Sequence, residues 1–213
     1  MPAPPMPEDP SQILSRVNHL QPGDSSQELY DLWASDYDTH LLEDFGYLSP
    51  LIAARTLAEE IDERDAEIID FGCGTGLVGV ALQQQGFNKV DGVDISSGML
   101  GRAREKNAYR ELIQADLTQP LHIESGRYDA GFCVGSMGAG HVGAQHGIEL
   151  LRCIAPGGLF IICINAMHYQ SEGFEQSFQQ MQDDGLWSIL RLQEFNYMSS
   201  LERPGWLLLA RKG

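Results

Sequence analysis

The hydrophobic pattern divides the chain into a helical first part and a second part of alternating strands and helices. Up to about residue 60, apolar residues recur at helical spacing, clearest over 29–34 and 51–57. Ser49 before Pro50 predicts a cap and a first-turn proline for the second of these helices. In the rest of the chain, short apolar runs alternate with helical stretches, which is typical of a parallel β-sheet. The pattern therefore predicts an α/β fold.

The second part contains five predicted strands with helices among them, and then two apolar runs with no convincing helix between them. So short a link cannot make a parallel crossover, and we expect an antiparallel hairpin at the sheet edge. The expected strands are Glu67–Phe71, Lys89–Val93, Arg110–Gln114, Tyr128–Val134 and Gly158–Ile164, the helices cover about 76–86, 97–107 and 143–154, and the hairpin joins Leu192–Met198 to Trp206–Arg211.

The length of 213 residues allows one well-buried α/β core and is short for two. We expect a single domain over 26–213 whose first part, about 26–60, forms a helical cap. Residues 1–25 are expected to be a mobile segment, because the first ten residues hold five of the ten prolines. The sequence does not determine the oligomeric state.

The net charge of −16 would repel a phosphate backbone, so we expect no nucleic-acid partner. No window approaches the roughly 20 apolar residues of a membrane span, which argues against a membrane partner. The first residues lack the basic start and apolar stretch of a secretory signal, and this predicts a cytoplasmic location. No metal site is expected, because the four cysteines are far apart and form no C-x-x-C pair; they are Cys73, Cys133, Cys153 and Cys163.

A glycine-rich turn after the first predicted strand is the most informative feature. Gly72, Gly74 and Gly76 follow the strand and precede a helix, where glycine lets the backbone adopt positive φ and pass close to a ligand. Gly74, Gly76 and Gly79 also match the dinucleotide fingerprint G-x-G-x-x-G literally, so NAD is an alternative ligand. The register disagrees, because that fingerprint should begin directly after the strand.

Asp70 at the end of the first strand separates these two ligands by charge. An unpaired carboxylate would repel a pyrophosphate, whereas it could partner the ammonium group of S-adenosylmethionine, directly or through water. Asp94 ends the second strand and could accept hydrogen bonds from both ribose hydroxyls of either cofactor. The pair therefore favours S-adenosylmethionine.

Apolar and acidic residues after the next strands could hold an adenine ring. Ile95 and Met99 could sandwich the flat ring, although ordinary helix packing explains them equally well. Asp116 could accept from the adenine amino group with Leu117 against the ring, although an isolated Asp is more often a turn cap. The ligand crevice should open between the first and fourth strands, where Val134 and its neighbours would form a wall beside the methionine part.

These residues resemble class I S-adenosylmethionine-dependent methyltransferases, across roughly residues 26 to 164. The matching segments are Asp70–Gly76, Gly92–Ser96 and Ala155–Gly158. The resemblance implies a Rossmann-like, seven-stranded, mostly parallel sheet of order 3-2-1-4-5-7-6 with helices on both faces. It also implies that Tyr37, on a segment similar to the helix that small-molecule members fold over the cofactor, reaches the methionine end. A weaker resemblance is to the methyltransferase-like branch named after the Williams–Beuren chromosomal region.

A dedicated catalytic base is optional, because the sulfonium is already an activated methyl donor. His141, in the loop after the fourth strand, is the best-placed candidate, ahead of His146, His168 and His40, and its alternative role is simply to begin a helix or line the loop. Phe174, Phe178 and Met181, with Trp187 beyond, form a stripe that we expect to pack on the sheet, whereas Trp33 and Tyr37 better suit an aromatic wall around a cation.

The sequence therefore predicts a methyltransferase that transfers a methyl group from S-adenosylmethionine, yielding S-adenosylhomocysteine, to an unidentified small-molecule acceptor. No segment of the Asn-Pro-Pro-Tyr kind follows the fourth strand, so adenine or glutamine-amide methylation is not indicated. Two alternatives are an NAD-dependent oxidoreductase and a non-catalytic S-adenosylmethionine-binding protein of the same fold.

Overall fold

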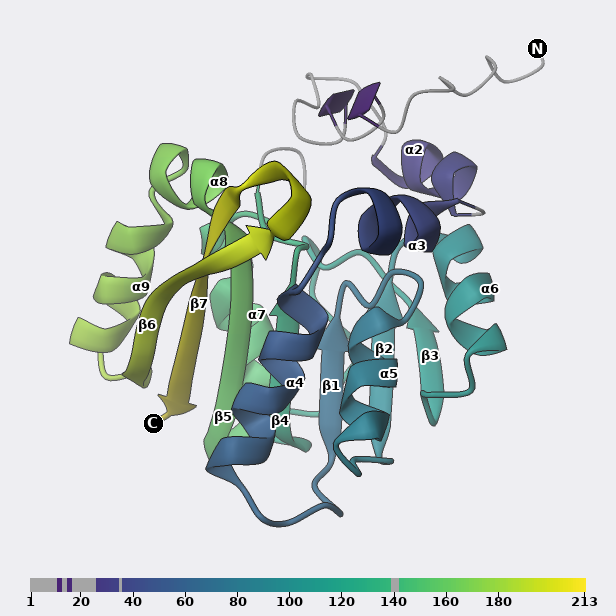
Figure 1. Ribbon diagram of the computed structural model, residues 1–213. Helices are drawn as coiled ribbons and strands as arrows, with labels where there is room; N and C mark the ends of the chain where they lie inside the picture. Colours follow the sequence, from purple (N-terminus) through teal and green to yellow (C-terminus); the bar gives the residue numbers. More distant parts are fainter. Residues whose placement is uncertain (1–10, 13–14, 17–25, 35, 139–141) are drawn as a thin grey trace.

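A single seven-stranded sheet forms the centre of the computed structural model, which describes residues 11–12, 15–16, 26–34, 36–138 and 142–213 (Figure 1). The strand order β3-β2-β1-β4-β5-β7-β6 confirms the order that the family resemblance implied. Strands β1 to β5 are parallel, and β7 pairs antiparallel with both β5 and β6. The strands are β1 Ile68–Phe71, β2 Val90–Asp94, β3 Glu111–Gln114, β4 Tyr128–Val134, β5 Ile154–Asn165, β6 Trp187–Met198 and β7 Arg203–Lys212.

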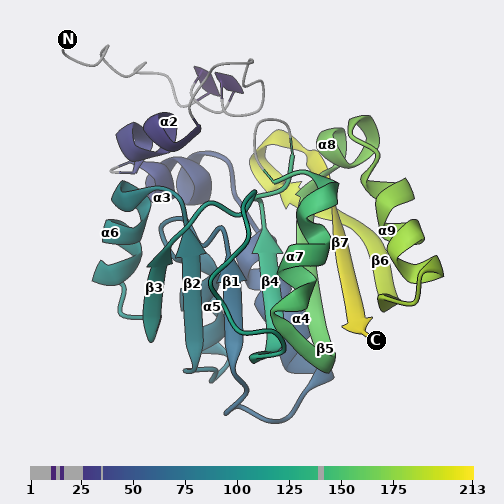
Figure 2. The same cartoon turned by 180° about the vertical axis from the view of Figure 1, so that it is seen from behind.

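Helices cover both faces of this sheet. Helices α4 and α5 lie on the face seen in Figure 1, α7 lies on the face seen in Figure 2, and α2 and α3 lie over the carboxyl ends of the strands. No helix in the described part of the chain is long and apolar enough to cross a membrane. The α-helices are α2 Ser26–Trp33, α3 Tyr37–Thr39, α4 Ser49–Glu60, α5 Leu77–Gln84, α6 Ser97–Glu105, α7 Gly147–Arg152, α8 Ala166–Ser171 and α9 Phe174–Asp183. The structure also contains a short π-helix, η1 His40–Asp44, and two 3₁₀ helices, η2 Ala144–His146 and η3 Ser199–Leu201.

Two hydrophobic clusters, one on each face, hold the helices to the sheet. Along β7, Leu207 and Leu209 belong to the first cluster and Leu208 and Ala210 to the second, because successive side chains of a strand point to opposite faces. The aromatic stripe of α9 lies in the second cluster, which confirms that it packs on the sheet; its members are Phe174, Phe178, Met181 and, from β6, Trp187. Each large apolar side chain buried in this way stabilises the fold by roughly 1.5–3 kcal/mol.

Three local predictions were wrong, each for a physical reason. Ser49 does not cap α4: it is the first helical residue, and its buried hydroxyl has no hydrogen-bond partner among the described residues. Strand β6 begins at Trp187 rather than Leu192. The prediction missed its first residues because the register shifts between Ile189 and Arg191, which interrupts the alternating pattern. Strand β5 begins at Ile154 rather than Gly158, and residues 155–158 lie inside it as an irregularity in its pairing with β4.

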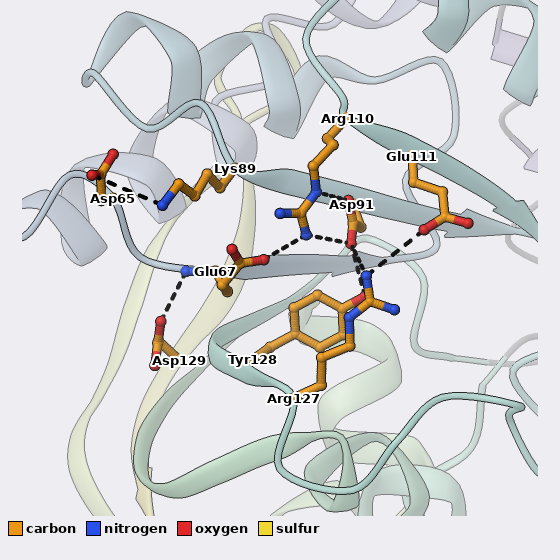
Figure 3. Close-up of polar contacts among 9 residues, drawn as sticks. All are labelled: Asp65, Glu67, Lys89, Asp91, Arg110, Glu111, Arg127, Tyr128 and Asp129. Atoms are coloured by element: carbon orange, nitrogen blue, oxygen red, sulfur yellow. Dashed lines mark hydrogen bonds and ion pairs between the residues drawn. The ribbon is translucent and has the colours of Figure 1, made fainter.

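A buried carboxylate joins the amino-terminal ends of the central strands (Figure 3). Asp91 on β2 is fully buried, and Arg110 donates to both of its oxygens, at 2.9 and 2.8 Å. Arg127 and the hydroxyl of Tyr128 donate to the same carboxylate at 3.0 and 2.9 Å. Since Arg110 precedes β3 and Tyr128 begins β4, this cluster fixes strands that are distant in the sequence. It lies at the amino-terminal ends of the strands, whereas the glycine turn lies at the carboxyl end of β1.

We predict that Asp91→Ala lowers the free energy of unfolding by about 3 kcal/mol, because it leaves two guanidinium groups and a hydroxyl without their shared partner. This value is at the lower end of the range for breaking a buried ion pair, because the Arg110 and Arg127 side chains are 38% and 37% exposed. Arg102→Ala, which removes an exposed pair with Glu105, should cost less than about 1 kcal/mol. Denaturant unfolding measures both, and equal effects would contradict the structural role of Asp91.

Candidate functional site

The candidate site is a cavity at the carboxyl ends of β1, β2 and β4. The cap formed by α2 and α3 lies over these strand ends (Figure 1). The cavity encloses about 930 Å³ including its open mouth, within the range usual for ligand pockets. The crevice lies between β1 and β4, where the strand order reverses, as predicted. Its walls are formed by Tyr30, Tyr37, Tyr47, Pro50, Gly72, Cys73, Gly74, Thr75, Leu77, Val78, Asp94, Ile95, Met99, Asp116, Leu117, Thr118, Val134, Gly135, Ser136 and Val142.

The glycine turn forms one wall because its backbone adopts conformations that other residues avoid. Gly72, Gly74 and Gly76 have φ values of 73°, 53° and 93°. A Cβ on Gly72 would lie 2.1 Å from the hydroxyl oxygen of Ser136, which donates to the Gly72 carbonyl at 3.0 Å. A Cβ on Gly74 would meet nothing within 4 Å. Gly72 is therefore required by packing against the loop after β4, whereas Gly74 faces open space in which a ligand can approach the backbone.

Asp94 fastens this turn to the end of β2. Its Oδ2 accepts from the backbone N–H of Gly74 at 2.8 Å, and its Oδ1 accepts from that of Ser96 at 2.9 Å. Burial raises the pKa of the Asp94 carboxyl, while the backbone hydrogen bonds oppose this rise. A carboxylate oxygen has room for more than one donor, so Asp94 can hold the turn and still accept from a ligand in the cavity.

Asp70 lies behind the glycine turn and does not line the cavity. It is fully buried in the centre of the sheet, and its Oδ2 accepts from the hydroxyl of Tyr109 at 2.7 Å. Its Oδ1 has no partner among the described residues. Burial raises the pKa of the Asp70 carboxyl to about 7, although the Tyr109 hydrogen bond opposes the rise.

Tyr109, in the connection between α6 and β3, explains the literal dinucleotide fingerprint. Its hydroxyl accepts from the backbone N–H of Gly79 at 2.9 Å. A Cβ on Gly79 would lie 2.4 Å from the Tyr109 ring, and one on Gly76 would lie 2.9 Å from it. These two glycines are thus required by a tyrosine inside the protein, and the spacing needs no pyrophosphate to explain it.

The cap is tied to the carboxyl ends of the strands by two carboxylates. Asp31 on α2 accepts from the hydroxyl of Ser96 and, at 2.9 Å, from the backbone N–H of Gly98, at the start of α6. Asp38 on α3 accepts from the hydroxyl of Thr75 and pairs with Lys106 at 2.6 Å. A negative side chain at the start of a helix is favoured by the helix dipole. The cap is therefore held over the cavity by polar contacts as well as by packing.

The predicted adenine-binding residues meet at one end of the cavity. Ile95, Met99 and Leu117 line it together with Asp116, as the positions at the strand ends suggested. The Oδ1 of Asp116 accepts from the backbone N–H of Thr118 at 2.8 Å and from its hydroxyl at 2.7 Å. Asp116 therefore serves as a turn cap while its carboxyl group borders the cavity.

Tyrosines form another part of the cavity wall. Tyr37 lines it, as the resemblance implied, but Trp33 lies buried behind it and donates to His40 at 2.9 Å. Tyr30 and Tyr47 also line the cavity. Burial raises the pKa of all three tyrosine hydroxyls, so they remain neutral near physiological pH.

None of the histidines that the structure describes lines the cavity. His40 accepts from Trp33, His146 accepts from the backbone N–H of Gly143 at 3.1 Å, and His168 pairs with Glu172 at 2.8 Å. His141, the predicted base, lies outside the described residues. Among the residues described, no group of His, Cys, Asp and Glu could hold a metal, and the four cysteines are buried free thiols.

The structure brings most of the predicted cofactor residues together around the cavity and places two behind its wall. The two are Asp70 and Gly76, and the residues that line the cavity are Tyr37, Gly72, Gly74, Asp94, Ile95, Met99, Asp116, Leu117 and Val134. Sequence reasoning missed Tyr30, Tyr47 and Tyr109. Tyr30 lies in the segment that carried the family resemblance, but Tyr47 and Tyr109 belong to no motif and reach the site only through tertiary packing.

Comparison with known proteins agrees with the fold and with the glycine turn. The sequence model of the methyltransferase domain matches residues 68–158. Methyltransferase-like protein 27 from Homo sapiens is 34% identical over 177 residues, covering 78% of this chain and 71% of that protein. A shorter match, 35% identical over 69 residues, covers 32% of this chain and 24% of the 18S rRNA (guanine-N(7))-methyltransferase from Bos taurus.

Solved structures share the whole architecture. A Methanococcus maripaludis protein described as a putative S-adenosylmethionine-dependent methyltransferase superposes with a TM-score of 0.65, over 91% of this chain and 97% of its own, at 17% identity. At that identity the similarity establishes the fold alone.

Fold and glycine turn together define a Rossmann-like methyltransferase. The chain belongs to the class I S-adenosylmethionine-dependent methyltransferases and is an enzyme of that family. The match to Methyltransferase-like protein 27 supports the branch suggested by the sequence, and family membership favours a methyltransferase over an NAD-dependent oxidoreductase.

Two helical glycines test the packing of Tyr109 against the glycine turn. Gly79→Ala on α5 should lower the free energy of unfolding by about 1–3 kcal/mol, because the added methyl group overlaps the Tyr109 ring. Gly101→Ala on α6 should raise it by about 0.4–1 kcal/mol, since nothing lies within 4 Å and the unfolded chain loses freedom. Thermal or denaturant unfolding compares the two, and stabilisation by both would disprove the close contact.

Proposed function

We propose that this enzyme binds S-adenosylmethionine in the cavity beneath the cap and transfers its methyl group to a small-molecule acceptor. The observation that carries the proposal is the Asp94 carboxylate, which borders the cavity beside the open space in front of Gly74. A ribose at this position can donate both hydroxyls to Asp94 while its neighbouring groups approach the glycine backbone.

The rest of the donor follows from this placement. Ile95, Met99 and Leu117 would hold the adenine ring, and Asp116 would accept from its exocyclic amino group. These apolar walls match the flat ring, as in most cofactor sites.

The methionine part of the donor runs toward Val134 and Tyr37, at the opening between β1 and β4. Gly72 and Gly76 shape the turn around it. Asp70 acts on the ammonium group from behind the turn, through its charge or through water rather than by direct contact, because it is enclosed by the sheet and Tyr109. A cation in front of the turn would favour the ionised form of Asp70, whose pKa burial has raised.

A small acceptor agrees with the cap and with the charge of the protein. The contacts of Asp31 and Asp38 hold α2 and α3 over the cavity mouth, which narrows the access. The net charge of −16 disfavours a phosphate backbone as the acceptor.

The four buried thiols suit a reducing compartment, and this is the basis for proposing a cytoplasmic location.

In this mechanism the donor supplies an activated methyl group, and the protein aligns the acceptor and excludes water. Tyr30 and Tyr37 close one side of the cavity, and Val142 and Pro50 make other parts of the wall apolar. A separate base is needed only for an acceptor that must lose a proton before attack, and His141 is the candidate for that role.

Binding calorimetry tests the donor site. We expect S-adenosylmethionine and S-adenosylhomocysteine to bind with micromolar affinity, on the order of −8 kcal/mol, and NAD not to bind. Asp94→Ala should weaken both adenosyl ligands by about ten- to one-hundred-fold, because it removes hydrogen bonds to a charged group.

The matched control is Asp129→Ala. That carboxylate also accepts from a backbone N–H, that of Glu67 at 2.8 Å (Figure 3). It lies near the amino-terminal end of β4, away from the cavity. Affinity should be unchanged in this variant. Binding of NAD in place of the adenosyl ligands, or full affinity in Asp94→Ala, would refute the proposed site.

A further inference from the structure

The charged side chains around the cavity all have the same sign. Among the lining residues that the structure describes, only Asp94 and Asp116 are charged, and both are acidic. Lys106, the basic side chain attached to the glycine turn, is already paired with Asp38 at 2.6 Å and donates to the Thr75 carbonyl at 2.5 Å. An acceptor bearing a carboxylate or phosphate would therefore enter without a basic partner from these walls, and burying an unpaired charge is costly.

Three tyrosines, Tyr30, Tyr37 and Tyr47, also line the cavity, and the ring of Tyr197 packs against that of Tyr47 behind the wall. The rings of Tyr30 and Tyr37 lie 6.1 Å apart at 63°, edge to face. Those of Tyr47 and Tyr197 lie 5.2 Å apart at 64°. A Cβ on Gly135 would lie 2.5 Å from the Tyr47 hydroxyl and 3.0 Å from that of Tyr197, so both hydroxyls gather at the end of β4.

These tyrosines come from separate parts of the chain. Tyr30 and Tyr37 belong to the cap, Tyr47 precedes α4, and Tyr197 is near the end of β6. Burial keeps the hydroxyls neutral, and it raises the pKa of Tyr197 to about 12. Neutral phenol rings have electron-rich faces that attract cations, and their hydroxyl oxygens accept hydrogen bonds from an N–H group.

Building on the proposed function, we propose that the methyl acceptor is a small amine, whose nitrogen is held among Tyr30, Tyr37 and Tyr47. The amine first releases to water the proton that it carries near neutral pH. Its lone pair then forms the new nitrogen–carbon bond while the methyl carbon–sulfur bond breaks, and the electron pair of that bond stays on sulfur as a thioether. The positive charge passes from sulfur to nitrogen. A primary or secondary amine then releases its N–H proton to water, and a tertiary amine becomes a quaternary ammonium product.

The tyrosine walls suit this charge movement. A cation is present between the rings before the transfer, on sulfur, and after it, on nitrogen, so the ring faces are favourable at both stages. An anionic nucleophile would lose its charge in the reaction and would gain nothing from these faces. The same argument separates amines from alcohols, which give neutral products.

Three ligands of similar size and different charge test the proposal on the full chain saturated with S-adenosylhomocysteine. They are trimethyl(2-hydroxyethyl)ammonium, its neutral carbon analogue 3,3-dimethylbutan-1-ol, and the anion 3,3-dimethylbutanoate. Calorimetric titration should show the cation binding about ten-fold more tightly than the alcohol, with the carboxylate weakest.

Variants of Tyr47 show whether the rings cause this preference. Tyr47→Leu should reduce the preference for the cation over the alcohol by about three- to ten-fold, because it removes a ring face. Tyr47→Phe, which keeps the ring and loses only the hydroxyl, should retain the preference. The affinity of each variant for S-adenosylhomocysteine reports whether its donor site is intact.

Equal affinity for the cation and the alcohol, tighter binding of the carboxylate, or no binding of the cation would overturn the amine proposal. If S-adenosylhomocysteine binds and the cation is not preferred, the donor site stands and only the acceptor class is wrong. If S-adenosylhomocysteine itself does not bind, the proposed function fails first.

Discussion

The hydrogen bond between the Gly74 N–H and the Asp94 carboxylate joins the two chain segments on which the whole site depends. It ties the turn after β1 to the end of β2, and the second oxygen of the same carboxylate holds the start of the next helix through Ser96. Because Gly74 adopts positive φ and faces open space, the turn presents its backbone to the cavity instead of side chains. The candidate donor site thus arises from one carboxylate acting on two neighbouring strand ends.

The other contacts of the turn come from elements on either side of it. Tyr109 supports it from below by joining Gly79 to the buried Asp70, and Ser136 holds the Gly72 carbonyl from the loop after β4. Lys106, directly after α6, holds the Thr75 carbonyl and, through Asp38, attaches the cap. Cap, turn and sheet are therefore one connected polar network, and the tyrosines that the cap contributes are positioned by the same bonds that shape the donor site.

The sequence predicted the fold and the residues of the candidate donor site that line the cavity together, because these depend on local pattern. Alternating runs predicted the strands, and acidic residues at successive strand ends predicted Asp94 and Asp116 at one edge of the sheet. Asp70 shows where this logic stops. Its position at a strand end is right, but whether a side chain there faces the ligand or the interior depends on Tyr109, which comes from the connection between α6 and β3 and belongs to no motif.

The tyrosines of the cavity were harder to predict for the same reason. Tyr47 and Tyr197 are 150 positions apart and meet only because β6 and β7 return as a hairpin beside β5, which brings the end of β6 to the residues that precede α4. Ser49 failed as a cap because propensity says which residue can cap a helix, and not where the helix begins. Packing between segments that are distant in the sequence therefore determines where Tyr47 and Tyr197 lie.

The most direct test of the account is a crystal structure of the protein with S-adenosylhomocysteine. The account predicts both ribose hydroxyls on the Asp94 carboxylate, the adenine ring against Ile95 and Leu117, and the sulfur directed toward Tyr37. Density for the ligand elsewhere, or a ribose that does not contact Asp94, would contradict the account at its central point.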